Sequence, residues 1–131
     1  MKALIIEDQP MVRLLLKRLL TRFFQHNVLE AADGEEGLAI VEKERPVIVF
    51  CDMFMPKLDG VGFLERLRAN PEFADLPVVA ISAAKDRDLV LKLVDLKIVD
   101  YIVKPINMEQ TFKRLEKLLP LVLTRGASAK R

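Results

Sequence analysis

The sequence predicts an α/β fold in which helices cover both faces of a five-stranded parallel sheet. Three observations predict it. Short apolar runs alternate with longer segments of helical periodicity along the chain, the connections between them are short, and the run at 47–51 is apolar throughout. Strands buried on both faces read this way, and right-handed helical crossovers between parallel strands generate a doubly wound sheet.

The first half of the chain provides three strands and two helices. Residues 2–6 form an apolar run that ends at two acids, which predicts a strand. Pro10 stands where the first turn of a helix tolerates a missing N–H, with Asp8 or Gln9 as the cap. Apolar residues then repeat at helical spacing over 11–23. The elements that follow are a strand at 27–31, a helix at 35–44 and a strand at 47–51.

The second half provides two more strands and three helices. They are a helix at 61–69, a strand at 78–81, a helix near 87–96, a strand at 98–103 and a last helix from Asn107. Pro120 is expected to end that helix because it cannot donate the next hydrogen bond. Residues 121–123 begin either a linker or a continuing helix. We therefore expect one domain at 1–119, followed by a basic tail or the start of a linker at 120–131.

Length and composition support one globular domain. The 131 residues are 51% hydrophobic, which is too much for a disordered chain. The single cysteine, Cys51, excludes an intramolecular disulfide and favours a reducing compartment. No apolar run approaches the ~18 residues that would span a bilayer, and no signal-peptide core is present. We expect a cytoplasmic protein without a membrane partner.

The charge balance does not indicate nucleic acid. The formal charge of +2 becomes −1 once Arg125, Lys130 and Arg131 are set aside, and these three residues lie beyond the last predicted helix. A basic patch on the folded part would be needed for binding to a polyanion.

Polar residues follow four of the predicted strands. Glu7 and Asp8 follow the first strand, Asp52 the third, Ser82 the fourth and Lys104 the fifth. In open parallel sheets, sites form beyond the carboxyl ends of the strands. Three carboxylates, one hydroxyl and one ammonium are therefore expected to converge at one edge of the sheet.

This set of groups suits phosphoryl transfer. Adjacent carboxylates raise each other's pKa or require a cation, and a hard ion with oxygen ligands such as Mg²⁺ is the natural partner. Lys104 adds a positive charge and Ser82 a neutral donor. A pocket for a transient dianion beside a carboxylate predicts transfer of a phosphoryl group onto that carboxylate.

An ordered set of motifs carries a family resemblance. The motifs are Glu7-Asp8, Asp52-Met53-Phe54-Met55-Pro56, Gly60, Ile81-Ser82-Ala83-Ala84 and Tyr101-Ile102-Val103-Lys104-Pro105. Together they resemble the receiver domains of bacterial two-component response regulators, of the chemotaxis single-domain type. The resemblance implies a flavodoxin-like sheet with the strand order 2-1-3-4-5.

The resemblance also implies a role for each acid. Asp52 is the expected phosphoacceptor, which takes a phosphoryl group from a sensor histidine kinase or a histidine phosphotransfer protein. Asp8 and Asp52, with the backbone carbonyl of Phe54, are the expected Mg²⁺ ligands, and Glu7 acts through bound water.

The remaining roles concern binding and switching. Lys104 is expected to hold a phosphoryl oxygen and to pair with Asp52 beforehand. Ser82 is expected to move toward the phosphoryl group, and Tyr101 to turn inward as it does so. A cis peptide bond is expected before Pro105, since only X–Pro bonds adopt it at low cost.

Two positions predict a long-lived phosphoryl group. Phe54 stands two residues after Asp52, and Ala84 two residues after Ser82. Neither side chain can orient a hydrolytic water. We expect no enzymatic activity beyond self-phosphorylation from a donor and slow self-dephosphorylation.

The segment around the fourth predicted helix differs from the family in its sequence and carries a surplus of apolar residues. The family's Gly-Ala pair is replaced by Leu96-Lys97-Ile98-Val99. Without glycine, a left-handed helix cap is unfavourable, so we expect an extended or shifted helix end. The predicted helix near 87–96 also carries more apolar residues than the one stripe that a helix buries against a core. A large exposed apolar patch usually marks an interface. A homodimer or an output partner is therefore expected to dock on the fourth helix, fifth strand and fifth helix.

Two other functions are considered. Haloacid-dehalogenase-like phosphatases also use an aspartate nucleophile after a strand, but they carry a second aspartate where Phe54 stands here. An interaction module that is no longer phosphorylated would not need the acidic set, Ser82 and Lys104. The chain is either a stand-alone receiver or a part of a longer protein.

Overall fold

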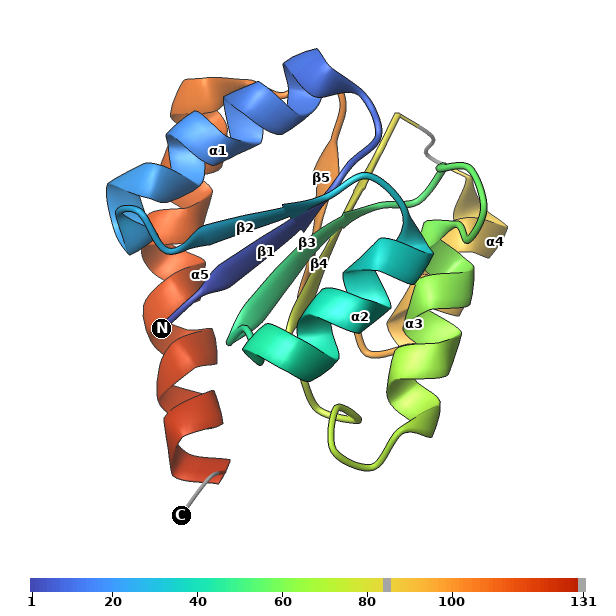
Figure 1. The fold of residues 1–131 in the computed structure, drawn as a ribbon. Coiled ribbons are helices and arrows are strands. Elements are labelled where there is room, and N and C mark those ends of the chain that lie inside the picture. The colour runs from blue at the N-terminus through green and yellow to red at the C-terminus, as the bar shows by residue number, and fades with distance from the viewer. Residues whose placement is uncertain (84–85, 130–131) are drawn as a thin grey trace.

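The computed structural model describes the backbone of residues 1–83 and 86–129, with side chains as far as Leu123. Its five strands form one parallel sheet in the order β2-β1-β3-β4-β5, as predicted (Figure 1). The strands are β1 (Ala3–Ile6), β2 (Val28–Ala31), β3 (Ile48–Asp52), β4 (Val78–Ser82) and β5 (Asp100–Val103). The fifth strand begins two residues later than predicted, because residues 98–99 belong to the turn that follows α4.

Five helices cover the sheet. They are α1 (Pro10–Phe24), α2 (Gly34–Glu44), α3 (Gly60–Ala69), α4 (Arg87–Asp95) and α5 (Met108–Ala129). Helices α1 and α5 lie on one face, and α2, α3 and α4 lie on the other (Figure 1). Helices α1 to α4 each connect two successive strands that run parallel, so the carboxyl ends of all five strands lie at the same edge of the sheet.

Alternating side chains of the strands fill two apolar cores. On β1, Ala3 and Ile5 face α1 and α5, whereas Leu4 and Ile6 face the other three helices. The strands β3 and β4 divide their side chains in the same way. The three central strands are fully buried, which explains why they are apolar throughout.

Side chains cap most of the helices. Asp33, Asp59, Asp86 and Asn107 each accept a hydrogen bond from a backbone N–H of the following turn, at 2.8–2.9 Å. The predicted cap of α1 is right in position but wrong in that no side chain caps the helix. Gln9 occupies the capping position, but its side chain makes no capping hydrogen bond.

The end of α4 corrects a second expectation. The helix neither extends nor shifts; it ends at Asp95, and Lys97 adopts the left-handed conformation with φ 63°. The N–H of Lys97 donates to the carbonyl of Val94 at 2.9 Å, and the N–H of Ile98 donates to that of Leu93 at 3.2 Å. This pair of bonds is a Schellman motif, which here forms around a lysine instead of glycine.

The last helix corrects a third expectation. Pro120 does not end α5, which continues to Ala129. Pro120 is exposed, whereas Leu119 and Val122 are buried against the core, so packing offsets the one hydrogen bond that proline removes. In the predicted basic tail, Arg125 belongs to α5, whereas Lys130 and Arg131 lie outside the described residues. Ala84 also lies outside them.

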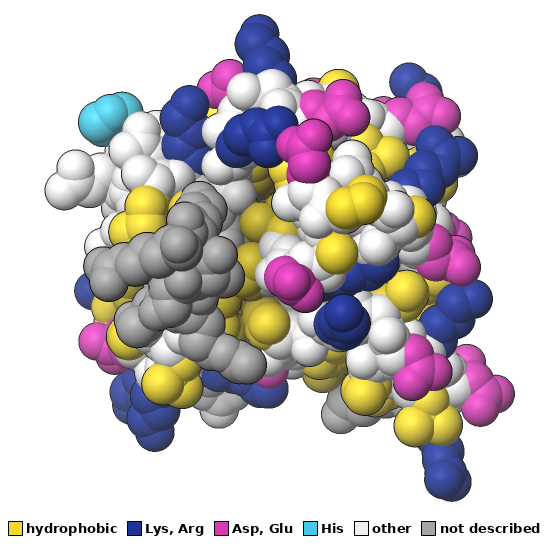
Figure 2. Space-filling view, turned by 90° about the horizontal axis from the view of Figure 1, so that it is seen from below, with side chains coloured by type: hydrophobic (Ala, Val, Ile, Leu, Met, Phe, Trp, Pro, Cys, Tyr) yellow, Lys and Arg dark blue, Asp and Glu magenta, His cyan; other side chains and the backbone are white. Residues whose placement is uncertain are grey.

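The amino ends of the strands carry no group of three acids that could hold a metal ion, among the described residues. A groove of about 560 Å³ lies there between the end of α1 and α5, lined by Met1, Phe23, Leu115, Leu119 and Leu123 among others. Figure 2 views the molecule from below and shows charged side chains of both signs spread around the hydrophobic ones. No helix in the described part of the chain is long and apolar enough to cross a membrane.

Candidate functional site

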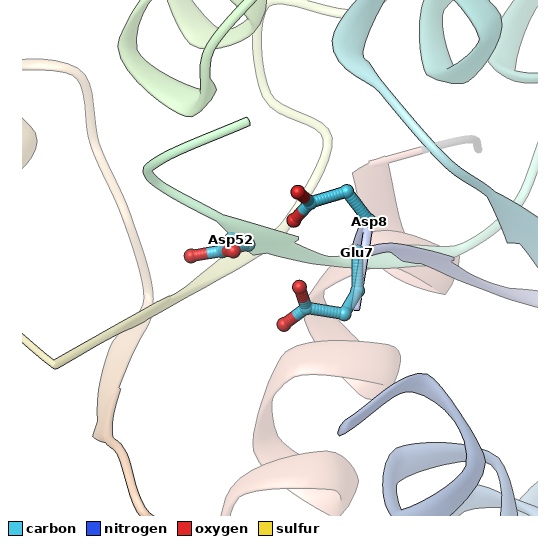
Figure 3. A group of neighbouring side chains, drawn as sticks. All are labelled: Glu7, Asp8 and Asp52. Atoms are coloured by element: carbon cyan, nitrogen blue, oxygen red, sulfur yellow. The ribbon is translucent and has the colours of Figure 1, made fainter. Parts of the chain in front are cut away.

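Three carboxylates meet at the opposite edge of the sheet, as predicted. Glu7 and Asp8 follow β1, and Asp52 is the last residue of β3. Their carboxylate oxygens lie within 4.8 Å of one another and point to the same side (Figure 3). The register pairs Ile6 with Cys51, so Glu7, which follows β1, lies level with Asp52 at the end of β3. Glu7 and Asp52 are buried, and Asp8 is half-buried.

Lys104 lies among these acids. Its Nζ is 2.9 Å from Glu7 Oε1 and 3.1 Å from Asp52 Oδ2. Burial opposes the charged form of Lys104, but the hydrogen bonds and charges of Glu7 and Asp52 raise its pKa overall. The ammonium therefore stays protonated and offsets part of the negative charge.

Glu7 is the carboxylate of the cluster whose ionised form is disfavoured by burial. Its side chain is fully buried, and burial raises its pKa from 4.5 to about 7; Asp52 also raises it, whereas Lys104 and the backbone N–H of Gln9 lower it. Oε1 has Lys104 as its ion-pair partner but no well-aligned hydrogen bond among the described residues. A carboxylate at this depth, only partly compensated by Lys104, favours either a proton or a further cation.

The other predicted residues surround the cluster. Ser82 is fully buried at the end of β4, and its carbonyl accepts the backbone N–H of Lys104 at 2.9 Å. Tyr101 is half-buried on β5 and packs on the core that faces α4. The side chain of Phe54 is 60% exposed, while its N–H donates to Asp52 Oδ1 at 3.3 Å. The Lys104–Pro105 peptide bond is cis.

The contacts of two residues, Gln9 and Arg13, were missing from the sequence prediction. Gln9 Oε1 accepts a hydrogen bond from Lys104 Nζ at 3.3 Å, and the N–H of Gln9 donates to Glu7 Oε2 at 3.1 Å. The guanidinium of Arg13 donates to the backbone carbonyl of Glu7 at 2.9 Å. The position of Gln9 directly after the acidic pair was the only signal in the sequence, and it was interpreted as a helix cap.

The family is decided by comparison with known proteins. The family model described as "Response regulator receiver domain" matches residues 3–116. This chain belongs to the response regulator receiver family. The receiver domains of this family are signalling domains, not enzymes in the usual sense, and they take phosphoryl groups from histidine kinases. The membership disfavours the phosphatase alternative.

Relatives of this receiver include both short and long proteins. A probable C4-dicarboxylate response regulator, DctR, from Bacillus subtilis is 37% identical over 88% of this chain, which spans about half of that relative's length. A probable chemotaxis protein, CheY, from Rhizobium etli is 35% identical, covering 88% of this chain and 89% of that protein. The phosphorylated cyanobacterial phytochrome response regulator RcpA is similar in structure, with a TM-score of 0.80, 26% identity and coverage of 95% of this chain and 94% of its own.

Proposed function

We propose that this receiver accepts a phosphoryl group on Asp52 from a sensor histidine kinase or a histidine phosphotransfer protein. The observation that carries the proposal is the joint position of Asp52 and Lys104, with Nζ 3.1 Å from Oδ2 at the carboxyl edge of the sheet. Asp52 as a whole is only 3% exposed, so its carboxylate is poorly hydrated. A relative of similar structure that was solved in its phosphorylated form supports the proposal.

The acidic cluster fits Mg²⁺. Three carboxylates within 4.8 Å, one with a buried oxygen that lacks a well-aligned hydrogen bond, form a donor set of the hard oxygen type. Asp8, Asp52 and the backbone carbonyl of Phe54 would hold the ion directly, and Glu7 through water. When bound, Mg²⁺ would neutralise charge on the phosphoryl oxygens.

The side chains of the site have separate tasks in the transfer. An oxygen of Asp52 forms the new P–O bond while the P–N bond to the donor histidine breaks, and the imidazole leaves with the electron pair. Lys104 exchanges its contact with Asp52 for one with a phosphoryl oxygen. Gln9, which contacts the same ammonium, keeps it at the mouth of the site. Ser82 donates its hydroxyl hydrogen to another phosphoryl oxygen.

The experiment is incubation with a small phosphoryl donor and Mg²⁺, followed by intact mass measurement. We expect a stable gain of one phosphoryl group that is absent in Asp52→Asn and present in Asp95→Asn, an exposed aspartate of α4. Continuous release of inorganic phosphate over many turnovers would instead favour a phosphatase. An unchanged mass would indicate an unphosphorylated interaction module.

The phosphoryl group on Asp52 is expected to be long-lived. Phe54 stands at the mouth of the site with its ring 60% exposed, and it has no polar atom that could orient an attacking water. The chain would therefore hold its signal until a partner removes it, with no enzymatic activity beyond its own phosphorylation and slow dephosphorylation.

The output surface consists of α4, β5 and α5. Leu93 is the only buried residue of α4, while Leu91 and Val94 are 53% and 60% exposed and Val103 of β5 is 38% exposed. Apolar side chains that the core does not cover are typical of an interface. When Ser82 and Tyr101 rearrange, this surface would change and bind a second copy or an output partner.

The cytoplasm, where Cys51 stays reduced, is the expected compartment.

Sedimentation tests the dimer form of this proposal. We expect a larger species with beryllofluoride and Mg²⁺ than without them, and a return to monomer in Val94→Glu. A monomer under both conditions would exclude the dimer and leave an output partner as the occupant.

A further inference from the structure

One arginine outside the phosphorylation site joins three segments of the fold. Arg68, near the end of α3, donates through Nε to the carbonyl of Leu96 at 2.8 Å and through Nη2 to that of Lys97 at 3.3 Å. Its Nη1 donates to the carbonyls of Leu76 at 2.8 Å and Phe73 at 3.2 Å. The first two acceptors belong to the end of α4, and the other two to the connection from α3 to β4.

These contacts suit a guanidinium better than any other side chain. Arg68 is half-buried, and all four hydrogen bonds in which it takes part go to backbone carbonyls. A planar group with five donors can reach two loops at once, and a positive charge is favourable at the carbonyl end of a helix. Charge-assisted hydrogen bonds of this kind are about twice as strong as neutral ones.

The end of α4 is held by further contacts at the same place. The Schellman motif at Lys97 and Ile98 closes the helix there. The ammonium of Lys97 also lies 3.8 Å from Asp75, an exposed residue of the same α3–β4 connection. The carboxyl end of α4 is therefore tied to α3 and to the entrance of β4.

The rest of α4 makes fewer polar contacts with other elements among the described residues. Leu93 is its only buried residue and lies near the tied end, while Leu89, closer to the amino end, is half-buried against the same core. The amino end begins at Asp86, whose side chain caps the helix through the N–H of Asp88 at 2.8 Å, and both residues are exposed. This end follows β4 and Ser82 in the chain, so it is the end that a change at Ser82 reaches first.

We propose that Arg68 is a positioning residue that makes the carboxyl end of α4 a pivot, so that a change at Ser82 tilts the helix about Lys97 instead of displacing it as a whole. This proposal rests on the proposed phosphorylation of Asp52. It assigns to the receiver a fixed point for the output surface, because Leu91 then moves along an arc whose centre is set by α3.

Hydrogen exchange measured by mass spectrometry tests the pivot. Arg68→Met removes the donors and keeps the stem, and Arg68→Lys keeps the charge with fewer donors. Arg66→Met makes the same change at an exposed arginine two residues away on α3. Each protein is measured without ligand and with beryllofluoride and Mg²⁺, on peptides that cover residues 86–91 and 92–99.

We expect a divided response in the wild type and in Arg66→Met. Beryllofluoride should change exchange at 86–91 and leave 92–99 within about twofold. In Arg68→Met without ligand, exchange at 92–99 should rise by about tenfold, the effect of losing charge-assisted hydrogen bonds. Beryllofluoride should then change exchange over the whole of α4, and Arg68→Lys should lie between the two.

The contrary outcomes separate this proposal from the one it rests on. A wild type that responds to beryllofluoride, with an Arg68→Met variant that behaves like Arg66→Met, overturns the role of Arg68 alone. A wild type that neither gains a phosphoryl group nor responds overturns both. If circular dichroism shows Arg68→Met to be unfolded, Arg68→Lys decides, since a response identical to the wild type would also overturn the pivot.

Discussion

Replacing the buried Glu7 by glutamine is expected to stabilise the metal-free receiver above neutral pH. Burial, together with the charge of Asp52, raises the pKa of Glu7 from 4.5 to about 7. The folded protein therefore pays for ionising this group, and glutamine has the shape of the protonated form. Lys104 keeps its partner Asp52 in the variant.

The magnitude follows from the two pKa values. Above pH 4.5 the unfolded chain releases the Glu7 proton, while the folded chain keeps it until pH rises through about 7. The folded state binds more protons in this window, so the free energy of unfolding falls as pH rises and levels off above it. At about 1.4 kcal/mol per pH unit, the loss amounts to roughly 3 kcal/mol.

The assay is urea unfolding of the wild type and Glu7→Gln at pH 5 and pH 8 with a chelator present. The variant should gain less than about 1 kcal/mol at pH 5 and about 3 kcal/mol at pH 8. Glu42→Gln, at an exposed glutamate of α2, should change the free energy of unfolding by less than about 0.5 kcal/mol at both pH values. An equal gain at pH 5 and pH 8, or a loss at pH 8, would refute the reasoning.

Three further changes test the site and its surroundings. Phe54→Asn should shorten the life of the phosphorylated protein at least about tenfold, because the asparagine can orient a water molecule. The measurement is the loss of the phosphoryl mass over time, and a life of seconds in both proteins would contradict the prediction. Lys97→Gly should stabilise the protein by about 0.5 kcal/mol in urea unfolding, because about 1–2 kcal/mol of left-handed strain is relieved and about 1 kcal/mol of glycine entropy is added; a lower midpoint would argue against the strain. Gly60→Ala should destabilise by about 2 kcal/mol and slow phosphorylation, since its Cβ would lie 2.4 Å from the Asp52 carbonyl oxygen; an unchanged midpoint would show that the loop can move aside.

The sequence predicted the strands and helices well because their signals are local. The apolar run before Glu7 and the one before Asp52 each specify a strand that is buried on both faces, and the acid marks where burial ends. Apart from the start of β5, the errors lie at helix ends. Lys97 adopts a left-handed conformation, and Arg68, 29 residues earlier, donates a hydrogen bond to its carbonyl; no local rule contains that contact.

Pro120 is a second case in which contacts between residues far apart in the chain override a local signal. A proline predicts a helix end when only its own backbone is considered. Here Leu119 and Val122, on either side of it, are buried against residues of α1 and the sheet, and this packing keeps the helix continuous. Local propensity is a weak term beside the burial of two apolar side chains.

The sequence by itself determined the class of fold and which residues are available for chemistry, because periodicity sets the elements and parallel strands bring their carboxyl ends to one edge. Tertiary structure alone decided how those residues are charged and held. Only packing buries Glu7 completely and so raises its pKa, only the sheet register brings Lys104 within 3.1 Å of Asp52, and only the fold joins Arg68 to the end of α4. Desolvation, ion pairing and long-range hydrogen bonds depend on distances between residues far apart in the chain.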